Sequence, residues 1–339
     1  MAQRLSFKPT ERSLIIPMMV NEDNIRAVQK AITDKQTRGF FCPTVFVLEP
    51  TSNCNLSCVM CPNGLMPDSD LGEMSLVNFQ KTIDKISPYC EFLMLYWMGE
   101  STLHQHFSEI LHYARKKIKG RIVLSSNMTF QCEKITKSIA KNVDIALCCI
   151  DRWNERKYEN IRRGAKFDSV VKNTKNLLKQ SKNMPCTVVV KALDINIDTD
   201  EYKEFEKYWK QLDAVTMLAW LNDWAGSMSS LRKAAKIDVP NANKERVPCA
   251  DLWFKMVINW KGDVQICCFD WKYEQSVGSI LSSTTLEVWQ SEKMSRFRAA
   301  HVSGEYDTPE MCFECDSWSD EKEHKAYLSS TIEDYFRIF

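Results

Sequence analysis

Between Thr44 and Trp224 the chain alternates short apolar runs with longer amphipathic segments. The short runs are rich in β-branched residues, as buried strands are, and the longer segments repeat apolar residues at the spacing of one helix face. The predicted strands are Val45–Leu48, Phe92–Trp97, Ile122–Ser125, Val143–Ile150, Thr187–Leu193 and Val215–Trp220. The predicted helices between them are Leu76–Ile86, Phe107–Lys117, Glu133–Ala140, Phe167–Gln180 and Glu201–Gln211. This alternation indicates an α/β fold with a parallel sheet, which we expect to form a partial (β/α)6 barrel of the TIM type.

The pattern changes after Trp224. Residues 226–248 are small, polar and basic without a clear period, which indicates a linker. A hairpin of Phe254–Trp260 and Asp263–Cys268 follows, because Lys261-Gly262 is a turn signal. Further predicted helices are Asn24–Thr33, Thr285–His301 and Ser319–Phe339. The predicted parts are an N-terminal extension (1–40), the barrel (41–225), the linker (226–248), a small C-terminal domain (249–318) and a terminal helix (319–339).

Composition narrows the classes of partner. The chain has 339 residues and a net charge of +1, so it has no long-range attraction for phosphate backbones or acidic membranes. The apolar run Leu14–Val20 is followed by acidic Glu22 and Asp23 and does not resemble a secretory signal. No run approaches the ~18 apolar residues of a membrane span. We expect a cytoplasmic protein with no nucleic-acid or membrane partner, and its 14 cysteines then indicate metal or redox chemistry.

Three cysteines, Cys54, Cys58 and Cys61, lie in one short loop after the first predicted strand. A barrel places its active site in such loops. The Cys-x3-Cys-x2-Cys spacing lets a tight loop aim three thiolates at one iron–sulfur cubane, and a [4Fe–4S] cluster with three protein ligands keeps one iron open for chemistry. A structural zinc site is the alternative, but it usually closes with a fourth Cys or His nearby, and none follows within the loop.

A second set of cysteines lies toward the C-terminus. It consists of Cys249, Cys267, Cys312 and Cys315, of which the last two form Cys-x2-Cys. Four cysteines close a [4Fe–4S] cluster completely or hold a structural zinc ion, and the spacing alone does not separate these alternatives. Cys268 is spare in either interpretation.

With these motifs, the stretch from Thr44 to Trp318 resembles the radical S-adenosylmethionine (SAM) superfamily, and in particular its twitch/SPASM subgroup. The resemblance implies that SAM chelates the open iron through its amino and carboxylate groups. It also implies reductive cleavage of SAM to methionine and a 5′-deoxyadenosyl radical, which abstracts a hydrogen atom from the substrate. Because cluster reduction needs a low potential, a flavodoxin or ferredoxin is the expected electron donor.

The same resemblance implies which residues contact SAM on the first two strands. Met60, before the third cysteine, stands where the family contacts the adenine. Met98-Gly99-Glu100 resembles the GGE-type motif that holds the SAM amino group, although Met98 replaces the first glycine and Ser101 the usual proline. A carboxylate such as that of Glu100 can pair with an ammonium group.

Two later segments match in order. Ser126 and Asn127, after the third predicted strand, resemble the polar pair that contacts the ribose or carboxylate of SAM. Arg162-Arg163-Gly164 resembles the Arg-Gly element that reaches the SAM carboxylate, with Arg163 as the candidate residue. A planar guanidinium suits a carboxylate partner.

For the second cysteine set, the resemblance favours iron and sulfide over zinc. Cys-x12-Gly-x4-Cys followed by a distant Cys-x2-Cys is similar to the twitch version of the SPASM extension, which carries one auxiliary [4Fe–4S] cluster, and its spacing is close to that of the subgroup's aminocyclitol dehydrogenase. Asn222–Gly226 is also typical of the subgroup. The expected fold is thus a partial barrel followed by a small twitch/SPASM-like iron–sulfur domain, and the expected cofactors are two [4Fe–4S] clusters and SAM.

Three fates of the substrate radical give three reactions. Loss of an electron to the auxiliary cluster and of a proton to a base gives a dehydrogenation, for which Lys191 on the fifth predicted strand is the candidate base. Gain of a hydrogen atom from a thiol gives epimerisation, and combination with a thiolate or carbon gives a crosslink. Adjacent strand residues face opposite ways, so one of Cys148 and Cys149 points into the barrel, and Cys149 is the candidate hydrogen donor.

The length of the N-terminal extension predicts the class of substrate. About forty residues precede the barrel, fewer than the roughly eighty of the peptide-recognition domain of many peptide-modifying relatives. This favours an oxidoreductase that dehydrogenates a sugar or aminocyclitol-like small molecule. A radical SAM epimerase or thioether-forming enzyme acting on a ribosomal peptide is the alternative. A non-catalytic module with two zinc sites is a more distant one.

Overall fold

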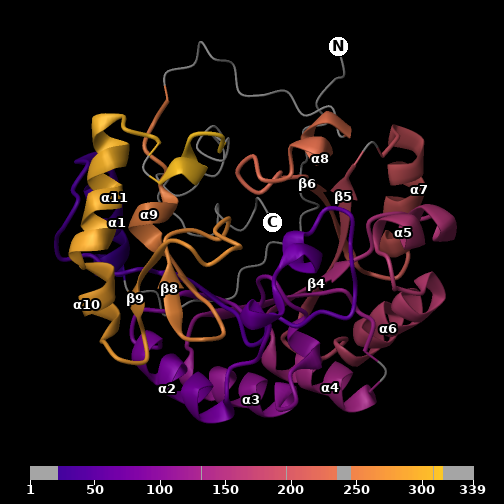
Figure 1. Cartoon of the computed structure of the whole chain (residues 1–339). Coiled ribbons are helices and arrows are strands. Elements are labelled where there is room, and N and C mark those ends of the chain that lie inside the picture. The colour runs from indigo at the N-terminus through magenta and orange to yellow at the C-terminus, as the bar shows by residue number, and fades with distance from the viewer. Residues whose placement is uncertain (1–21, 131, 196, 235–245, 308, 316–339) are drawn as a thin grey trace.

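The computed structural model describes residues 22–130, 132–195, 197–234, 246–307 and 309–315. Within them a 9-stranded sheet has the order β6-β5-β4-β3-β2-β1-β7-β8-β9. The pairs from β6 through β1 to β7 are parallel, and β8 and β9 are antiparallel to their neighbours. The strands β1 to β6 follow the chain in order across the sheet, with helices outside them (Figure 1). The expected partial α/β barrel is therefore confirmed.

The barrel strands are β1 (Val45–Leu48), β2 (Phe92–Met94), β3 (Arg121–Ser126), β4 (Ile145–Cys149), β5 (Thr187–Asp194) and β6 (Val215–Trp220). The helices of this part are α2 (Leu76–Ile86), α3 (Phe107–Lys117), α4 (Glu133–Asn142), α5 (Glu155–Ile161), α6 (Phe167–Gln180), α7 (Thr199–Lys210) and α8 (Ser229–Ala234). The strands fit the predicted pattern of buried apolar runs, because β1, β2 and β4 are buried along their whole length. The extra helix α5 was not predicted, and α8 occupies part of the expected linker.

The C-terminal region continues the barrel sheet. Its first strand, β7 (Lys255–Ile258), pairs in parallel with β1, and the predicted hairpin is confirmed by β8 (Asp263–Gln265), which turns back on β7. β9 (Ser276–Ser279) completes the sheet. Gly262 in the hairpin turn has a φ of 87°, a left-handed conformation that favours glycine. The segment between Cys249 and Cys267 is therefore joined to β1 by a shared sheet.

The helices of the C-terminal region cover this end of the sheet together with α1 (Glu22–Thr33). They are α9 (Asp251–Phe254), α10 (Thr285–Trp289) and α11 (Glu292–Ser303). The prediction of one helix over Thr285–His301 was wrong, because Ser291 caps a new helix by accepting a hydrogen bond from the N–H of Met294. The predicted helix Ser319–Phe339 lies outside the described residues.

Polar contacts tie the two regions together. The Lys85 ammonium of α2 donates to the backbone oxygens of Ile280, Leu281 and Ser283 at 2.6, 3.2 and 2.9 Å.

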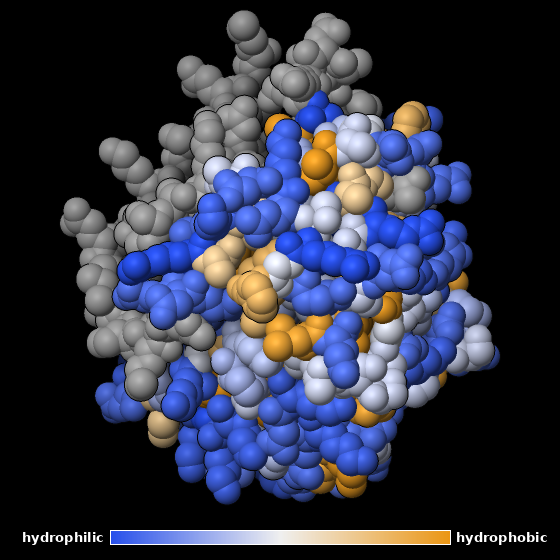
Figure 2. Space-filling model, turned by 90° about the vertical axis from the view of Figure 1, so that its left-hand side faces the viewer, coloured by the Kyte–Doolittle hydropathy of each residue, from blue (hydrophilic) through white to orange (hydrophobic). Residues whose placement is uncertain are grey.

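The face of the molecule on the side of α10 and α11 is mostly hydrophilic, with smaller hydrophobic areas between the hydrophilic ones (Figure 2). No helix in the described part of the chain combines the length and the apolar character needed to cross a membrane.

Candidate functional site

The loop with the first three cysteines follows β1 and is pinned to the segment after β4. The backbone N–H groups of Ser57 and Val59 donate to the carbonyl oxygens of Arg163 and Ile161, each at 3.0 Å. The loop therefore sits at the C-terminal end of the parallel strands, where α/β barrels hold their chemistry.

The thiols of Cys54, Cys58 and Cys61 interact electrostatically with one another. Burial raises the pKa of the Cys54 thiol to about 12 and that of the Cys58 thiol to about 11. Thiols with such pKa values are protonated at neutral pH, and a metal that binds them displaces the protons. Three thiols gathered in one loop fit a soft, thiolate-binding group such as an iron–sulfur cluster.

Gly99 brings the end of β2 against the cysteine loop. A Cβ atom at this position would lie 2.2 Å from the carbonyl oxygen of Thr51 and 2.7 Å from that of Asn53. The next residue, Glu100, donates its backbone N–H to the same Asn53 oxygen at 2.9 Å. Only glycine allows this approach, which explains the glycine in the Met98-Gly99-Glu100 motif.

The buried carboxylate of Glu100 gathers the predicted polar pair. It accepts hydrogen bonds from the hydroxyl of Ser126 at 2.9 Å and from the backbone N–H of Asn127 at 2.7 Å. Its first oxygen also accepts from the hydroxyl of Thr102 at 2.7 Å. The structure thus brings Glu100, Ser126 and Asn127 together, and a donor from SAM would have to use the second oxygen, which accepts the bond from Asn127.

Asn127 connects this group of hydrogen-bonded residues to the cysteine loop. Its side-chain nitrogen donates to the amide oxygen of Asn55 at 3.1 Å and lies 4.0 Å from Cys54 Sγ. Thr129 in turn accepts a hydrogen bond from Asn55 at 2.9 Å. The predicted SAM contacts of β2 and β3 are therefore continuous with the cysteines.

The two adjacent arginines after α5 have different environments. Arg162 pairs with the buried carboxylate of Asp151 at 2.7 Å, and its Nη1 lies 4.0 Å from Cys58 Sγ. Arg163, the predicted residue, is exposed. The structure thus brings the Arg162 side chain to the cysteine loop, whereas the sequence motif favoured Arg163.

Met60 is buried in a small apolar cluster at the edge of the barrel. It packs with Leu221, which follows β6, and with Leu231 of α8. The side chain predicted to contact adenine therefore lies beside the end of β6.

Cys149 and Lys191 share one face of the sheet. They are register partners in the β4–β5 pair, so their side chains point the same way. Cys149 Sγ lies 3.3 Å from the hydroxyl of Ser125 and interacts electrostatically with Cys58, which places it on the interior face.

The neighbouring thiol points the other way. Cys148 is hydrogen-bonded to the side chain of Thr174 of α6, one of the helices outside the sheet. The alternation of the strand therefore leaves Cys149, and not Cys148, facing the cysteine loop.

The second cysteine set also converges. Cys249 interacts electrostatically with Cys312 and Cys315, and Cys267 with Cys249. Burial raises the pKa of the Cys312 thiol to about 12, and burial also raises the pKa of the Cys249 thiol well above its ordinary value. Residues separated by up to 66 positions in the chain thus form one thiol site, which fits a four-cysteine cluster.

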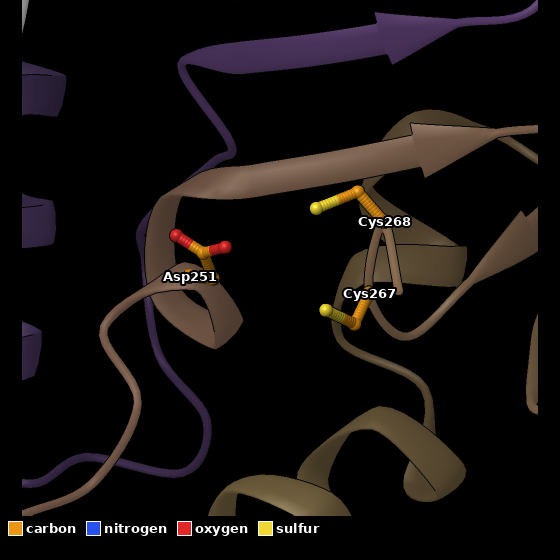
Figure 3. Close-up of side chains that lie close together, drawn as sticks. All are labelled: Asp251, Cys267 and Cys268. Carbon is orange, nitrogen blue, oxygen red and sulfur yellow. The ribbon is translucent and has the colours of Figure 1, made fainter. Parts of the chain in front are cut away.

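Cys268 and Asp251 lie beside this set. Their ligand atoms and the sulfur of Cys267 are all within 4.8 Å of one another, and the two sulfurs face the carboxylate (Figure 3). The Asp251 carboxylate also pairs with Lys255 at 2.7 Å. Sequence reasoning did not select Asp251, although its place two residues after Cys249 was a signal.

Fold and site together define an α/β barrel protein with two cysteine sites for iron–sulfur clusters. Residues 48–206 match the radical SAM superfamily, and residues 249–316 match the iron–sulfur cluster-binding domain named SPASM. The chain therefore carries a radical SAM domain followed by a SPASM domain. SAM and [4Fe–4S] clusters are its cofactors, and the zinc-module alternative is set aside.

Three known proteins illustrate the similarity. The tungsten-containing aldehyde ferredoxin oxidoreductase cofactor-modifying protein of Pyrococcus furiosus is 25% identical over 297 residues, 74% of this chain and 82% of that protein. The structure of Streptococcus suis SuiB bound to precursor peptide SuiA aligns with a TM-score of 0.62 and 13% identity, over 81% of this chain and 70% of that one. BtrN in complex with AdoMet and 2-DOIA aligns with a TM-score of 0.55 and 15% identity, over 81% of this chain and 93% of that one.

Proposed function

We propose that this radical SAM enzyme dehydrogenates a small polar molecule of the sugar or aminocyclitol class. The observation that carries the proposal is the convergence of Cys249, Cys267, Cys312 and Cys315 into one site. Four thiolates fill every ligand position of a [4Fe–4S] cluster, so the site suits an electron acceptor better than a substrate-binding centre.

When bound, SAM with its cluster supplies hydrogen-atom abstraction, and the auxiliary cluster accepts one electron. The chain itself has to accept the proton that completes a two-hydrogen oxidation. We assign that role to the amine of Lys191, because it shares the interior face of the sheet with Cys149, and Cys149 interacts with Cys58 of the SAM-binding loop.

The proposed SAM contacts come from the ends of β2 and β3, which are joined to the loop of the first three cysteines by hydrogen bonds. Glu100, Ser126 and Asn127 would orient SAM from the ends of β2 and β3, where they form one hydrogen-bonded group. Arg162, beside Cys58, would face the SAM carboxylate, because a guanidinium suits a carboxylate partner.

Two similarities support a small substrate. The relative from Pyrococcus furiosus is named for modifying a cofactor, and the match extends over most of both chains. BtrN, whose structure contains 2-DOIA, is covered over 93% of its length. A flavodoxin or ferredoxin is the proposed electron donor.

A second candidate is modification of a ribosomal peptide by epimerisation or thioether formation. It is favoured by the structural similarity to SuiB in complex with its precursor peptide and by the interior position of the Cys149 thiol, the proposed hydrogen donor. Mass spectrometry of a candidate peptide coexpressed with the enzyme separates the candidates. Loss of two hydrogens indicates oxidation or a crosslink, whereas deuterium uptake from solvent without another mass change indicates epimerisation.

The test of the first proposal uses anaerobically purified protein and two cysteine variants. About eight irons per chain and dithionite-dependent formation of 5′-deoxyadenosine are expected for two clusters. Cys58→Ala should abolish SAM cleavage, whereas Cys312→Ala should retain cleavage but lose the oxidised product. Equal product formation by Cys312→Ala would remove the auxiliary cluster from the mechanism.

A further inference from the structure

The segment from Cys267 to Tyr273, beside the auxiliary site, is docked on the ends of the first two barrel strands. Tyr273 donates its hydroxyl to Glu49 after β1 at 2.7 Å, and the indole nitrogen of Trp97 after β2 donates to the Cys268 carbonyl at 2.7 Å. The auxiliary site is therefore tied to the rim of the barrel where the SAM-binding loop begins.

The same segment also reaches the other edge of the barrel. The ring of Phe269 lies 6.1 Å from that of Trp224, which follows β6, and the two rings are inclined at 78°. Since β1 and β6 are not paired with each other in the sheet, the segment spans the side of the barrel that the sheet leaves open.

Trp224 is in contact with both cysteine sites. Its indole nitrogen donates to the carbonyl oxygen of Met60, next to Cys61, at 2.9 Å. Its ring packs edge-on against Phe269, whose backbone N–H donates to Cys267 Sγ at 3.4 Å. One side chain thus joins the loop of the SAM-binding site to a ligand of the auxiliary site.

The backbone around Trp224 is strained. Trp224 and Ala225 have φ values of 57° and 54°, and Gly226 follows with 85°. Two successive non-glycine residues in the left-handed region persist only where their surroundings hold them. The auxiliary site confines this backbone in part, because Gly226 packs closely against Glu314 of the Cys312–Cys315 segment. A Cβ at Gly226 would lie 2.5 Å from Cβ of Glu314.

We propose that Trp224 is a positioning residue that couples the two cysteine sites, so that a filled auxiliary site fixes Met60 and raises the affinity for SAM. The coupling follows from the contacts, because closure of the auxiliary site orders Phe269 and Glu314, and these two residues confine the Trp224 loop. It rests on the proposed function in requiring two filled sites and on the expected contact of Met60 with the adenine of SAM, and it concerns binding of SAM before any substrate reacts.

The test is a double-mutant cycle on SAM affinity, measured by equilibrium dialysis with labelled SAM on anaerobic holoprotein. Trp224→Phe keeps a ring and removes one hydrogen bond, so SAM binding should weaken about fivefold. Cys312→Ala should weaken SAM binding by a similar factor, and it should have no further effect in the Trp224→Phe background. Additive effects, or an unchanged affinity in Trp224→Phe, would overturn the coupling.

Two further variants keep the result interpretable. Trp260→Phe loses an indole hydrogen bond of the same length, 2.9 Å, but to Asp70 and not to a cysteine loop, so its SAM affinity should stay unchanged. An equal loss in Trp260→Phe would mean general loosening and would overturn the proposal. Phe269→Leu acts from the other side, and it should weaken SAM binding only in protein whose auxiliary site is filled. If the wild-type protein binds no SAM, the assigned function fails, whereas normal wild-type binding with no effect of Trp224→Phe removes only the coupling.

Discussion

The fully buried carboxylate of Glu49 accepts a hydrogen bond of 2.7 Å from the hydroxyl of Tyr273. It also accepts from the backbone N–H groups of Trp260 and Met98 at 3.2 and 3.1 Å. The pair joins the end of β1, just ahead of the loop that carries Cys54, to the auxiliary region.

Burial raises the pKa of Glu49 to about 7, against the lowering effect of its hydrogen bonds to Tyr273, Trp260 and Met98. The folded protein then holds a proton that the unfolded chain releases above pH 4.5, so stability falls as the pH rises from 4.5 to about 7. Glu49→Gln removes this dependence, and its stability relative to wild type should rise by up to about 3 kcal/mol across that range. Chemical denaturation at several pH values measures the difference, and a constant difference would contradict the assignment.

Arg162 is predicted to matter more for SAM binding than Arg163. Arg162 lies 4.0 Å from Cys58 Sγ and is held by Asp151, whereas Arg163 is exposed. Arg162→Ala should weaken SAM binding at least about tenfold, because a charge-assisted hydrogen bond contributes more than a neutral one. The same dialysis on Arg163→Ala provides the comparison. A larger loss of SAM affinity in Arg163→Ala would indicate that Arg163, and not Arg162, contacts the SAM carboxylate.

Gly99→Ala should damage the SAM-binding site. The added methyl group would lie 2.2 Å from the Thr51 carbonyl and push the cysteine loop away from β2. Iron per chain should fall from about eight to about four, with loss of SAM cleavage. Gly64→Ala is the matched control, since its nearest neighbour is the Ser57 hydroxyl at 3.9 Å. Full iron content in Gly99→Ala would show that the cysteine loop accommodates the added methyl group without losing its cluster.

Gly226→Ala should damage the auxiliary site and leave SAM cleavage in place when SAM is saturating. Its Cβ would lie 2.5 Å from Cβ of Glu314, in the Cys312–Cys315 segment. Gly304→Ala has the same φ of 85° and meets only Tyr306 at 4.0 Å, so it carries the same backbone strain without the clash. Iron analysis should show a loss of about four irons in the first variant alone. Equal losses in both would point to backbone strain as the cause.

The local pattern of the chain predicted most of the elements. Buried strands and amphipathic helices have distinct periods, so β1, β5, β6 and the helices α2, α3 and α6 lie where the pattern placed them. The break between α10 and α11 was missed, because the apolar spacing continues through Ser291 and the cap is a local hydrogen bond.

The sequence by itself determined the family, the order of the barrel elements and the two sets of cysteines, because short-range spacing and composition carry that information. In the motif Arg162-Arg163-Gly164 and the pair Cys148-Cys149, the resemblance favoured Arg163 and Cys149.

The tertiary structure places the Cys149 thiol on the interior face, as the sequence favoured, but it alone showed that Arg162 reaches the cysteine loop. It also placed Trp224 between Met60 and Phe269. Such choices depend on how distant strands twist and pack against one another, which no local pattern records.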